Sequence, residues 1–299
     1  MTKIIVITGW DRSGSTILAS ALGSVDGVVT MGEVTNLWER GFGQDLLCSC
    51  SEPFSACSFW QPVAREAFGG DIASVAKRAE FAVTRLGNTA LAQRQLRGTA
   101  GVLDGSAPYG ELLAQVYRAG AEVSGASVIV DSSKKPWHTA VAMGLRDFDV
   151  YVLHVLRDPR GVAYSFQKQV AYDGGGQDMA RHSPTFSSLA WLYRNWLTES
   201  EWGDNPHYLR IRYEDFVREP RQTLLDVFAM IEEDLDPPLT ADDHLLLKPS
   251  HNISGNPARF TTGTIQLRLD DEWLTELPAG IRRYVSALTA AQRRRYGYR

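Results

Sequence analysis

Four short apolar runs, separated by long stretches with helical periodicity, dominate the hydrophobic pattern of this chain. The runs cover residues 3–7, 127–130, 149–156 and 208–211. A continuous apolar run of this length is typical of a strand buried on both faces, as in a parallel sheet covered by helices. The pattern therefore predicts a three-layer α/β/α fold of the P-loop-like type, with a central parallel sheet and ligands at the carboxyl ends of its strands.

Three of the intervening stretches have clear helical patterns. Residues 76–96 are rich in Arg, Ala and Leu, residues 186–202 carry several aromatic side chains, and residues 278–295 form the last predicted helix. Loops are expected at residues 41–58, which hold all three cysteines, and at the glycine-rich residues 172–177. Loops above such a fold commonly form the entrance for a second substrate, so we expect an acceptor to enter there.

Length and composition fit one domain over residues 1–299. With 44% hydrophobic residues the chain can bury a sizeable core, and its formal net charge of −4 argues against a general nucleic-acid or acidic membrane surface. The basic run at residues 293–295 is expected to be a solvated last helical turn. No membrane span is expected, because no apolar run approaches ~20 residues. The first residues lack the pattern of a signal peptide, so we expect a cytoplasmic protein.

A phosphate-binding loop is predicted at residues 8–16, with the sequence Thr-Gly-Trp-Asp-Arg-Ser-Gly-Ser-Thr. An apolar strand, a glycine-containing turn and a helix N-terminus together form a cradle for phosphate oxygens. Gly9 and Gly14 have the spacing of the glycines in a nucleoside-triphosphate loop, but Ser15 stands where that loop has its lysine. The loop is therefore predicted to hold phosphate without being equipped for ATP hydrolysis.

A second segment strengthens this interpretation. Residues 151–165 have a buried-strand pattern followed by Arg-Asp-Pro-Arg, with Ser165 eight residues after Arg157. Together the two segments resemble the nucleotide motifs of sulfotransferases that use 3′-phosphoadenosine 5′-phosphosulfate (PAPS). The resemblance implies that Arg157 and Ser165 bind the 3′-phosphate, for which arginine offers a two-pronged donor and serine a short hydroxyl. It also implies that the first loop holds the 5′-phosphosulfate, through Arg12, Ser13, Gly14, Ser15 and Thr16.

The resemblance extends along the chain. Residues 128–136 have the strand and polar turn that precede the 3′-phosphate strand in these enzymes, and residues 209–216 resemble their later segment of a strand and Tyr-Glu-Asp. Residues 255–260 correspond to the loop that closes over the nucleotide, although their order departs from the Arg-Lys-Gly form of the cytosolic members. These segments imply three further nucleotide-binding residues, which are Tyr213, Gly255 and Arg259.

The chemistry of sulfuryl transfer requires a base for the acceptor proton and cations for the departing phosphate, and it requires no metal. Tyrosylprotein sulfotransferases carry a pattern Arg-Ser-Gly-Thr-Thr…Gly-Glu, which Arg12 and Glu33 match in spacing. The resemblance implies that Glu33 is the general base, that Arg12 is a cation at the leaving group and that Lys134 stabilises the bridging oxygen. The alternatives are that Glu33 only caps or pairs at a helix start and that Lys134 is a solvated turn residue.

His138 is a second candidate base. Cytosolic small-molecule sulfotransferases place a catalytic histidine just after the corresponding strand, and the ordinary pKa of histidine suits it to accept a proton from a phenol. His138 lies beyond Pro136 and is expected one turn into a helix, where a packing role is the alternative. His182 and His251 are possible acceptor-site residues that no motif supports.

The cysteines, at positions 48, 50 and 57, leave three alternatives open. They could be reduced thiols that pack the loop, or Cys57 could form a disulfide with Cys48 or Cys50. A structural zinc site would need a histidine from elsewhere in the chain. A cytosolic location favours reduced thiols, and we expect no bound metal. Similar cysteine clusters in bacterial sulfotransferases imply a structural role.

The sequence thus predicts an enzyme that transfers a sulfuryl group from PAPS to a hydroxyl group or amine, leaving 3′-phosphoadenosine 5′-phosphate (PAP). The acceptor is expected to be a small molecule or a peptide. A P-loop kinase of small molecules is one alternative, but it would want a lysine in place of Ser15 and an acidic magnesium site. A catalytically silent nucleotide-binding protein is the other, and Glu33 and Lys134 argue against it. The sequence identifies neither the acceptor nor the oligomeric state.

Overall fold

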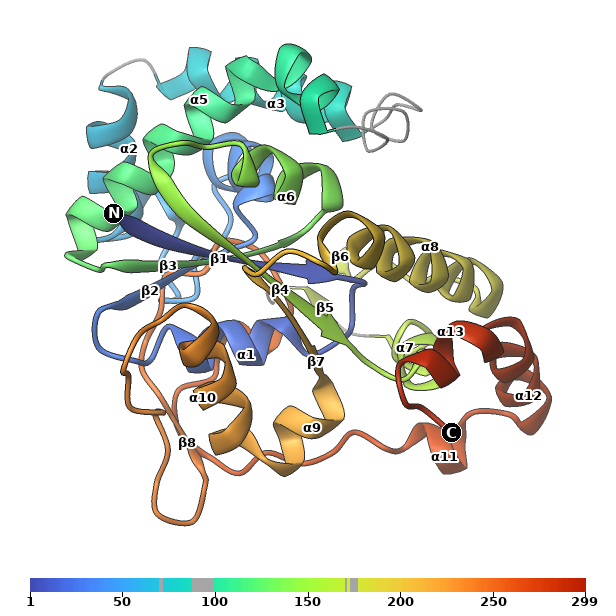
Figure 1. The fold of residues 1–299 in the computed structure, drawn as a ribbon. Coiled ribbons are helices and arrows are strands. Elements are labelled where there is room, and N and C mark those ends of the chain that lie inside the picture. Colours follow the sequence, from blue (N-terminus) through green and yellow to red (C-terminus); the bar gives the residue numbers. More distant parts are fainter. Residues whose placement is uncertain (70–71, 88–98, 170, 173–176) are drawn as a thin grey trace.

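A five-stranded sheet forms the centre of the structure (Figure 1), and its strand order is β2-β3-β1-β4-β7. All four strand pairs are parallel. The strands are β1 (Thr2–Gly9), β2 (Val28–Gly32), β3 (Val128–Lys134), β4 (Phe148–Leu156) and β7 (Tyr208–Arg212). This computed structural model describes residues 1–69, 72–87, 99–169, 171–172 and 177–299. The predicted parallel sheet is confirmed.

Helices cover both faces of the sheet (Figure 1). On one face lie α1 (Ser15–Leu22), α9 (Tyr213–Arg218) and α10 (Pro220–Met230). On the other lie α2 (Trp60–Phe68), α3 (Ile72–Gly87), α5 (Thr99–Ser124) and α6 (Pro136–Met143). The predicted three-layer fold is therefore confirmed.

A further group of helices packs beside the sheet (Figure 1). It consists of α7 (Pro159–Ser165), α8 (Pro184–Trp202), α11 (Trp273–Glu276), α12 (Ala279–Leu288) and α13 (Ala290–Arg295). Short helices are η1 (Val34–Asn36), η2 (Leu37–Gly43), η3 (Phe54–Ala56) and η4 (Pro257–Phe260). Two small antiparallel ribbons pair β5 (Ala171–Tyr172) with β6 (Gln177–Asp178), and β8 (Leu245–Leu247) with β9 (Gly263–Ile265). No helix in the described part of the chain is long and apolar enough to cross a membrane.

The alternation of side chains along β1 explains why both faces of the sheet are covered. Ile4 and Val6 point into the core beneath α2, α5 and α6, whereas Ile5 and Ile7 point into the core around α1 and α10. All four are at most 1% exposed. A strand with such a pattern is stable only between two layers of helices.

The predicted helices agree with the structure in part. The predicted helix at residues 186–202 lies within α8. Of the predicted helix at residues 76–96, residues 76–87 belong to α3, and residues 88–96 lie outside the described residues. The predicted helix at residues 278–295 is wrong in one respect, because it divides into α12 and α13 at Thr289. Thr289 departs from helical backbone angles, with φ −100° and ψ 6°, and its hydroxyl adds a bond to the carbonyl of Val285 at 2.8 Å, a contact that often bends helices.

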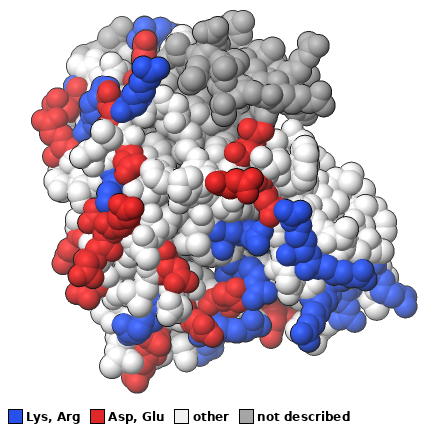
Figure 2. Space-filling view, viewed as in Figure 1, with Lys and Arg blue, Asp and Glu red and all other residues white. Residues whose placement is uncertain are grey.

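Charge is distributed unevenly over the surface (Figure 2). In this view Lys and Arg gather at the lower right, where α12 and α13 lie, and Asp and Glu lie mainly along the left edge. Arg294 and Arg295 are exposed, but Arg293 is buried, so the expectation of a fully solvated basic turn is wrong for that residue. The exposed Arg295 forms an ion pair with Glu199, with Nε 3.1 Å from the carboxylate.

Candidate active site

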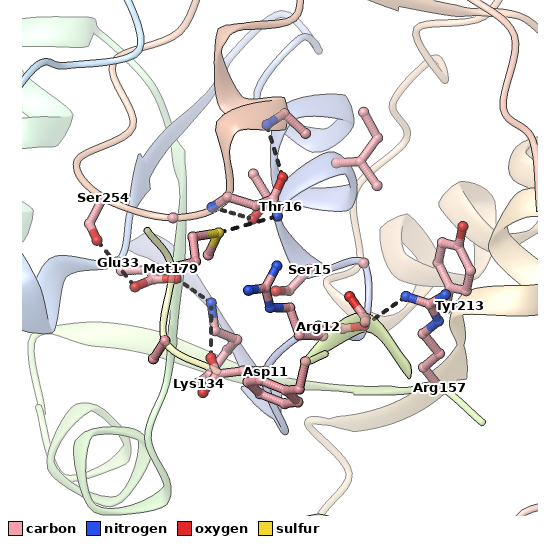
Figure 3. Close-up of a pocket in the computed structure, with 18 of the residues that line it drawn as sticks. Asp11, Arg12, Ser15, Thr16, Glu33, Lys134, Arg157, Met179, Tyr213 and Ser254 are labelled. Carbon is pink, nitrogen blue, oxygen red and sulfur yellow. Dashed lines mark hydrogen bonds and ion pairs between the residues drawn. The ribbon is translucent and has the colours of Figure 1, made fainter. Parts of the chain in front are cut away.

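A cavity of about 620 Å³ opens at the carboxyl ends of β1, β3 and β4. In Figure 3, Glu33 and Lys134 lie on one side of the view, Arg157 and Tyr213 on the other, and Arg12 between them. The structure thus brings together side chains from the two predicted nucleotide motifs. Ten predicted site residues line the cavity, namely Arg12, Gly14, Ser15, Thr16, Glu33, Lys134, Arg157, Ser165, Tyr213 and Gly255.

The loop between β1 and α1 has the backbone of a phosphate cradle. Gly14 has a φ of 81°, and a Cβ atom there would lie 2.4 Å from the ring of Tyr213, so only glycine fits this turn. Arg12 also has a positive φ of 66°, which is strained for a residue with a side chain and is typical of functional sites. The loop therefore ends with the N-terminus of α1 beside the cavity, where backbone N–H groups attract anions.

Arg12 lies in the cavity with part of its hydrogen-bonding capacity left unused by the described part of the chain. Its guanidinium lies 5.4 Å from the ring centre of Phe166, and its buried Nη2 has no hydrogen-bond partner among the described residues. Burial lowers the pKa of Arg12 against the opposing effect of Asp11. A buried donor without a partner is costly, so this side chain fits an anion that enters the cavity.

Lys134, Glu33 and Asp11 form an ion cluster at the end of β3. The Lys134 ammonium contacts a carboxylate oxygen of Glu33 and lies 3.7 Å from Asp11. Burial opposes the charge of Lys134, but the two carboxylates outweigh it and raise the pKa. Lys134 is buried and has a φ of 59°, so its alternative interpretation as a solvated turn residue is wrong.

Asp11 was not singled out in the sequence. Although burial alone would raise its pKa, four nearby cations lower it to about 2, and these are Lys134, Lys135, Arg194 and Arg12. Lys135 also lines the cavity, and burial lowers its pKa. The side of the cavity that holds Glu33 is thus rich in positive charge.

Three neighbours fix the position of Glu33, which follows β2. Its backbone N–H donates to the carbonyl of Ile253 at 2.9 Å. Its second carboxylate oxygen accepts from Asn36 Nδ2 at 2.6 Å and lies 3.4 Å from Ser254 Oγ. Glu33 precedes η1 but its side chain makes no capping hydrogen bond, so capping is wrong, whereas the ion pair with Lys134 agrees with the alternative of a paired side chain. The contacts with Asn36 and Lys134 therefore hold the Glu33 carboxylate in one orientation at the cavity wall.

Arg157 is bound at the opposite side. Its guanidinium donates to the carbonyl of Arg12 at 3.1 Å and stacks on the Tyr213 ring at 4.8 Å. Nη2 also contacts the carboxylate of Asp270 at 2.9 Å, and this contact contributes to the lowered pKa of Asp270 against burial. Ser165 lies on the same wall at the end of α7. Arg157 therefore already holds an anionic group.

Three predicted residues lie elsewhere. The side chain of Ser13, within the phosphate-binding loop, is buried. Arg259 is also buried, and its Nη1 donates to the carbonyl of Gly255 at 3.0 Å. His138 is fully buried, with its ring nitrogens 2.7 Å from Asp131 and 2.9 Å from the hydroxyl of Tyr109. None of the three is among the residues that line the cavity.

Several residues of the site escaped the sequence analysis. Asp11 could have been suspected because it adjoins Arg12 in the loop. No local pattern signals Asn36, Ser254 or Asp270, because only the folded chain brings them to the cavity. Of the two histidines without a motif, His182 lines the cavity, and His251 contacts the cysteines of the loop at residues 41–58.

Comparison with known proteins extends these observations. The sulfotransferase domain of the Synechococcus PCC 7002 olefin synthase is 19% identical, with a TM-score of 0.54 over 99% of this chain and 95% of that one. The sulfotransferase domain from the curacin biosynthetic pathway is 17% identical, with a TM-score of 0.53 over 100% of this chain and 99% of that one. These likenesses concern the fold. A search of curated proteins finds no match. Residues 5–237 match the sequence model described as "Sulfotransferase family".

Proposed function

This chain belongs to the sulfotransferase family, and we propose that it transfers a sulfuryl group from PAPS to a hydroxyl group or amine of an acceptor. The observation that carries the proposal is the cavity at which the phosphate-binding loop, Arg157, Glu33 and Lys134 meet. The loop and Arg157 supply positive charge for the two ends of a nucleotide, and Glu33 supplies a carboxylate. Because PAPS is made and used in the cytoplasm, we expect the protein to act there.

The residues of the cavity fit the two phosphate groups of such a donor. The unpartnered Nη2 of Arg12 and the N-terminus of α1 would receive the 5′-phosphosulfate. Arg157, which holds the carboxylate of Asp270, would exchange that anion for the 3′-phosphate, assisted by Ser165. Tyr213 packs against Gly14 and beneath Arg157, so it supports both ends of the site.

In the proposed reaction the acceptor oxygen forms a bond to sulfur, and the bond from sulfur to the 5′-phosphate oxygen breaks. Glu33 takes the acceptor proton, and the electron pair of the broken bond remains on the phosphate oxygen. Lys134 and Arg12 stabilise the negative charge that develops there. Lys134 is suited to this task because its ammonium already lies between carboxylates and can shift toward new negative charge.

We favour Glu33 over His138 as the base because of their different surroundings. Glu33 lines the cavity, whereas both ring nitrogens of His138 contact the buried side chains of Asp131 and Tyr109. Asp131 also accepts from the backbone of Ser133, next to Lys134. His138 thus acts as a positioning residue for the end of β3.

A direct assay tests the proposal. The protein is incubated with PAPS and a panel of phenols, sugars and hydroxylated peptides, and sulfated products and PAP are measured by mass spectrometry. Sulfation that depends on PAPS, with no product from ATP and Mg²⁺, is expected. Phosphorylated products from ATP would support a kinase instead. Binding of PAP without turnover of any acceptor, in the wild type and in Glu33→Gln alike, would support a silent nucleotide-binding protein.

A further inference from the structure

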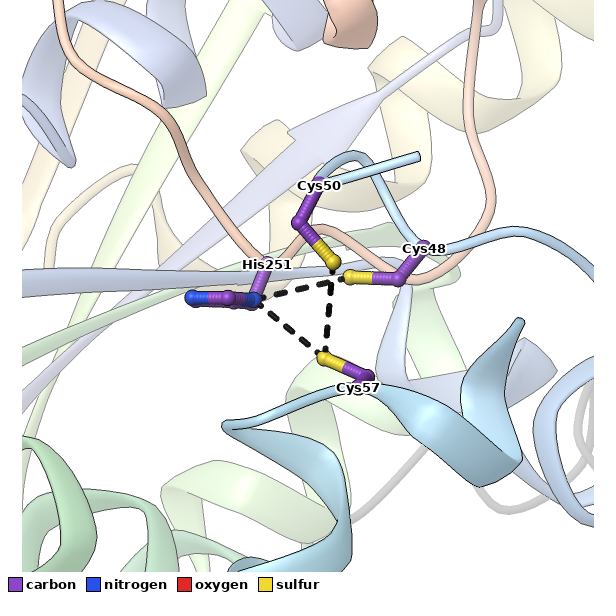
Figure 4. Close-up of side chains that lie close together, drawn as sticks. All are labelled: Cys48, Cys50, Cys57 and His251. Atoms are coloured by element: carbon purple, nitrogen blue, oxygen red, sulfur yellow. Dashed lines mark hydrogen bonds between the residues drawn. The ribbon is translucent and has the colours of Figure 1, made fainter. Parts of the chain in front are cut away.

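A second cluster of reactive side chains lies outside the cavity, where the cysteine loop (residues 41–58) meets a segment from near the C-terminus (Figure 4). It consists of Cys48, Cys50, Cys57 and His251, none of which lines the candidate active site. The three sulfur atoms and one imidazole nitrogen all lie within 4.8 Å of one another. His251 is the histidine from a distant part of the chain that a four-ligand site would need.

The distances within this cluster match those of a tetrahedral zinc site. Bond lengths of about 2.3 Å from zinc to sulfur and about 2.05 Å to nitrogen separate two sulfur ligands by about 3.8 Å, and sulfur from nitrogen by about 3.6 Å. The observed distance between the sulfur atoms of Cys50 and Cys57 is 3.7 Å. His251 Nδ1 lies 3.3 Å from the sulfur of Cys57 and 3.8 Å from that of Cys48. These three distances are close to the expected values, so the four side chains are arranged to receive one ion.

The backbone holds the cysteines in this arrangement. Cys48 and Cys50 lie in a tight turn, in which Ser51 N–H donates to the carbonyl of Cys48 and Cys48 N–H donates to that of Glu52, both at 2.9 Å. Cys57 follows η3 and precedes α2. A turn that supplies two thiols and a helix start that supplies a third are typical elements of zinc-binding modules.

His251 is oriented by contacts that do not involve the sulfur atoms. Its ring stacks on Phe59 with centroids 5.2 Å apart, and its carbonyl accepts from Trp60 Nε1 at 2.7 Å. The next residue, Asn252, pairs with Ser49 through two hydrogen bonds, at 2.7 and 3.2 Å. The imidazole is therefore presented to the three thiols by contacts that do not depend on an ion.

We propose that Cys48, Cys50, Cys57 and His251 bind one zinc ion in a closed structural site. Three thiolates and one imidazole are ligands that select zinc, and four protein ligands leave no position for a substrate. Cys48 and Cys57 are fully buried, so the ion replaces solvent as the partner of their sulfur atoms. This site replaces our expectation of reduced thiols, and it stands or falls independently of the proposed reaction.

The metal would connect the cysteine loop to the active site. The strand-like segment after His251 pairs with β2, where Ile253 bridges Gly32 and accepts from Glu33 N–H. Ser254 and Gly255, next along this segment, line the cavity. Zinc would therefore fix the segment that positions Glu33, without touching the reacting atoms.

The metal content of the protein tests the proposal. Untagged protein is purified without a strong chelator and analysed by inductively coupled plasma mass spectrometry, with X-ray absorption at the zinc edge. We expect about one zinc ion per chain with three sulfur ligands and one nitrogen ligand. A protein that neither contains zinc nor takes up zinc or cobalt with a thiolate-to-metal absorption band would overturn the proposal. So would an intact mass that lacks two hydrogens, which indicates a disulfide.

Two variants and one control identify the ligands. Cys57→Ser and His251→Gln should each lower zinc affinity at least 10-fold, measured by competition with a chromophoric chelator. His244→Gln, in a histidine outside the cluster, should retain wild-type affinity. Retention of zinc at wild-type affinity by both ligand variants would overturn the assignment. If the variants fail to fold, stoichiometric release of zinc from the wild type by a mercurial thiol reagent still tests it.

Discussion

Asp270 occupies the position where we propose that an anion binds, and this makes it the most informative residue to change. Its carboxylate lies 2.9 Å from Arg157 Nη2 and 3.5 Å from the Lys168 ammonium. A 3′-phosphate that binds Arg157 must displace this carboxylate or lie beside it. Asp270→Asn keeps the shape of the side chain and removes the competing charge, so PAP should bind more tightly.

The structure gives the size of the expected effect. Two unit charges separated by roughly 5 Å repel by about 3 kcal/mol at an effective dielectric constant of about 20. The side chain of Asp270 is 32% exposed, so solvent screening reduces this value. A gain of about 1 to 2 kcal/mol remains, which corresponds to a decrease in Kd of roughly 5- to 30-fold.

Calorimetric titration with PAP measures this change directly. Asp271→Asn is the matched control, because the same charge is removed from the adjacent, exposed residue. Arg157→Ala should weaken PAP binding by about 1.5 to 3 kcal/mol, because it removes a charged donor to the 3′-phosphate. Unchanged or weaker binding by Asp270→Asn would refute the assignment of Arg157 to the 3′-phosphate.

Three further predictions concern catalysis and stability. Glu33→Gln should lower kcat by roughly 10²- to 10⁴-fold with little change in the affinity for PAP. The exposed control Glu111→Gln should leave kcat unchanged. A Glu33→Gln enzyme with normal kcat would place the base elsewhere. His138→Gln should lower the free energy of unfolding by about 1 to 3 kcal/mol, measured in urea, because it disturbs the buried contacts with Asp131 and Tyr109. It should lower kcat less than Glu33→Gln does, and the opposite ranking would make His138 the base. Burial lowers the pKa of His154 from 6.5 to about 4, so the unfolded chain binds more protons between these values. Stability should therefore fall by up to about 3 kcal/mol as the pH decreases from 6.5 to 4, and His154→Gln should lose this part of the pH dependence.

The sheet and the meeting of the two nucleotide motifs at one cavity could be predicted, because the sequence patterns that indicate them are local. The apolar runs define β1, β3, β4 and β7, and the carboxyl ends of neighbouring parallel strands meet at one edge. Arg12 and Arg157 follow β1 and β4, which are adjacent in the sheet, so their motifs converge as a direct consequence of strand order.

The remainder depends on contacts between distant segments. Nothing near Cys57 in the sequence indicates that His251 lies 3.3 Å away, and nothing near Arg157 indicates that Asp270 contacts it. The C-terminal helix reads as continuous because Thr289 has an ordinary helical neighbourhood in the sequence. Its division reflects the backbone angles of Thr289, which depart from helical values and which propensity alone does not indicate.

The central place of β1 has a consequence for how the protein is made. Lys3 pairs with Val128 on one side and Asp149 on the other, so β1 has no neighbour until β3 has been synthesised and lacks its second neighbour until β4 follows. At ribosomal rates this delay lasts on the order of ten seconds, during which an apolar strand with two unpaired edges is exposed. High contact order of this kind slows folding, and it leaves the unpaired edges of β1 open to aggregation until β3 and β4 emerge.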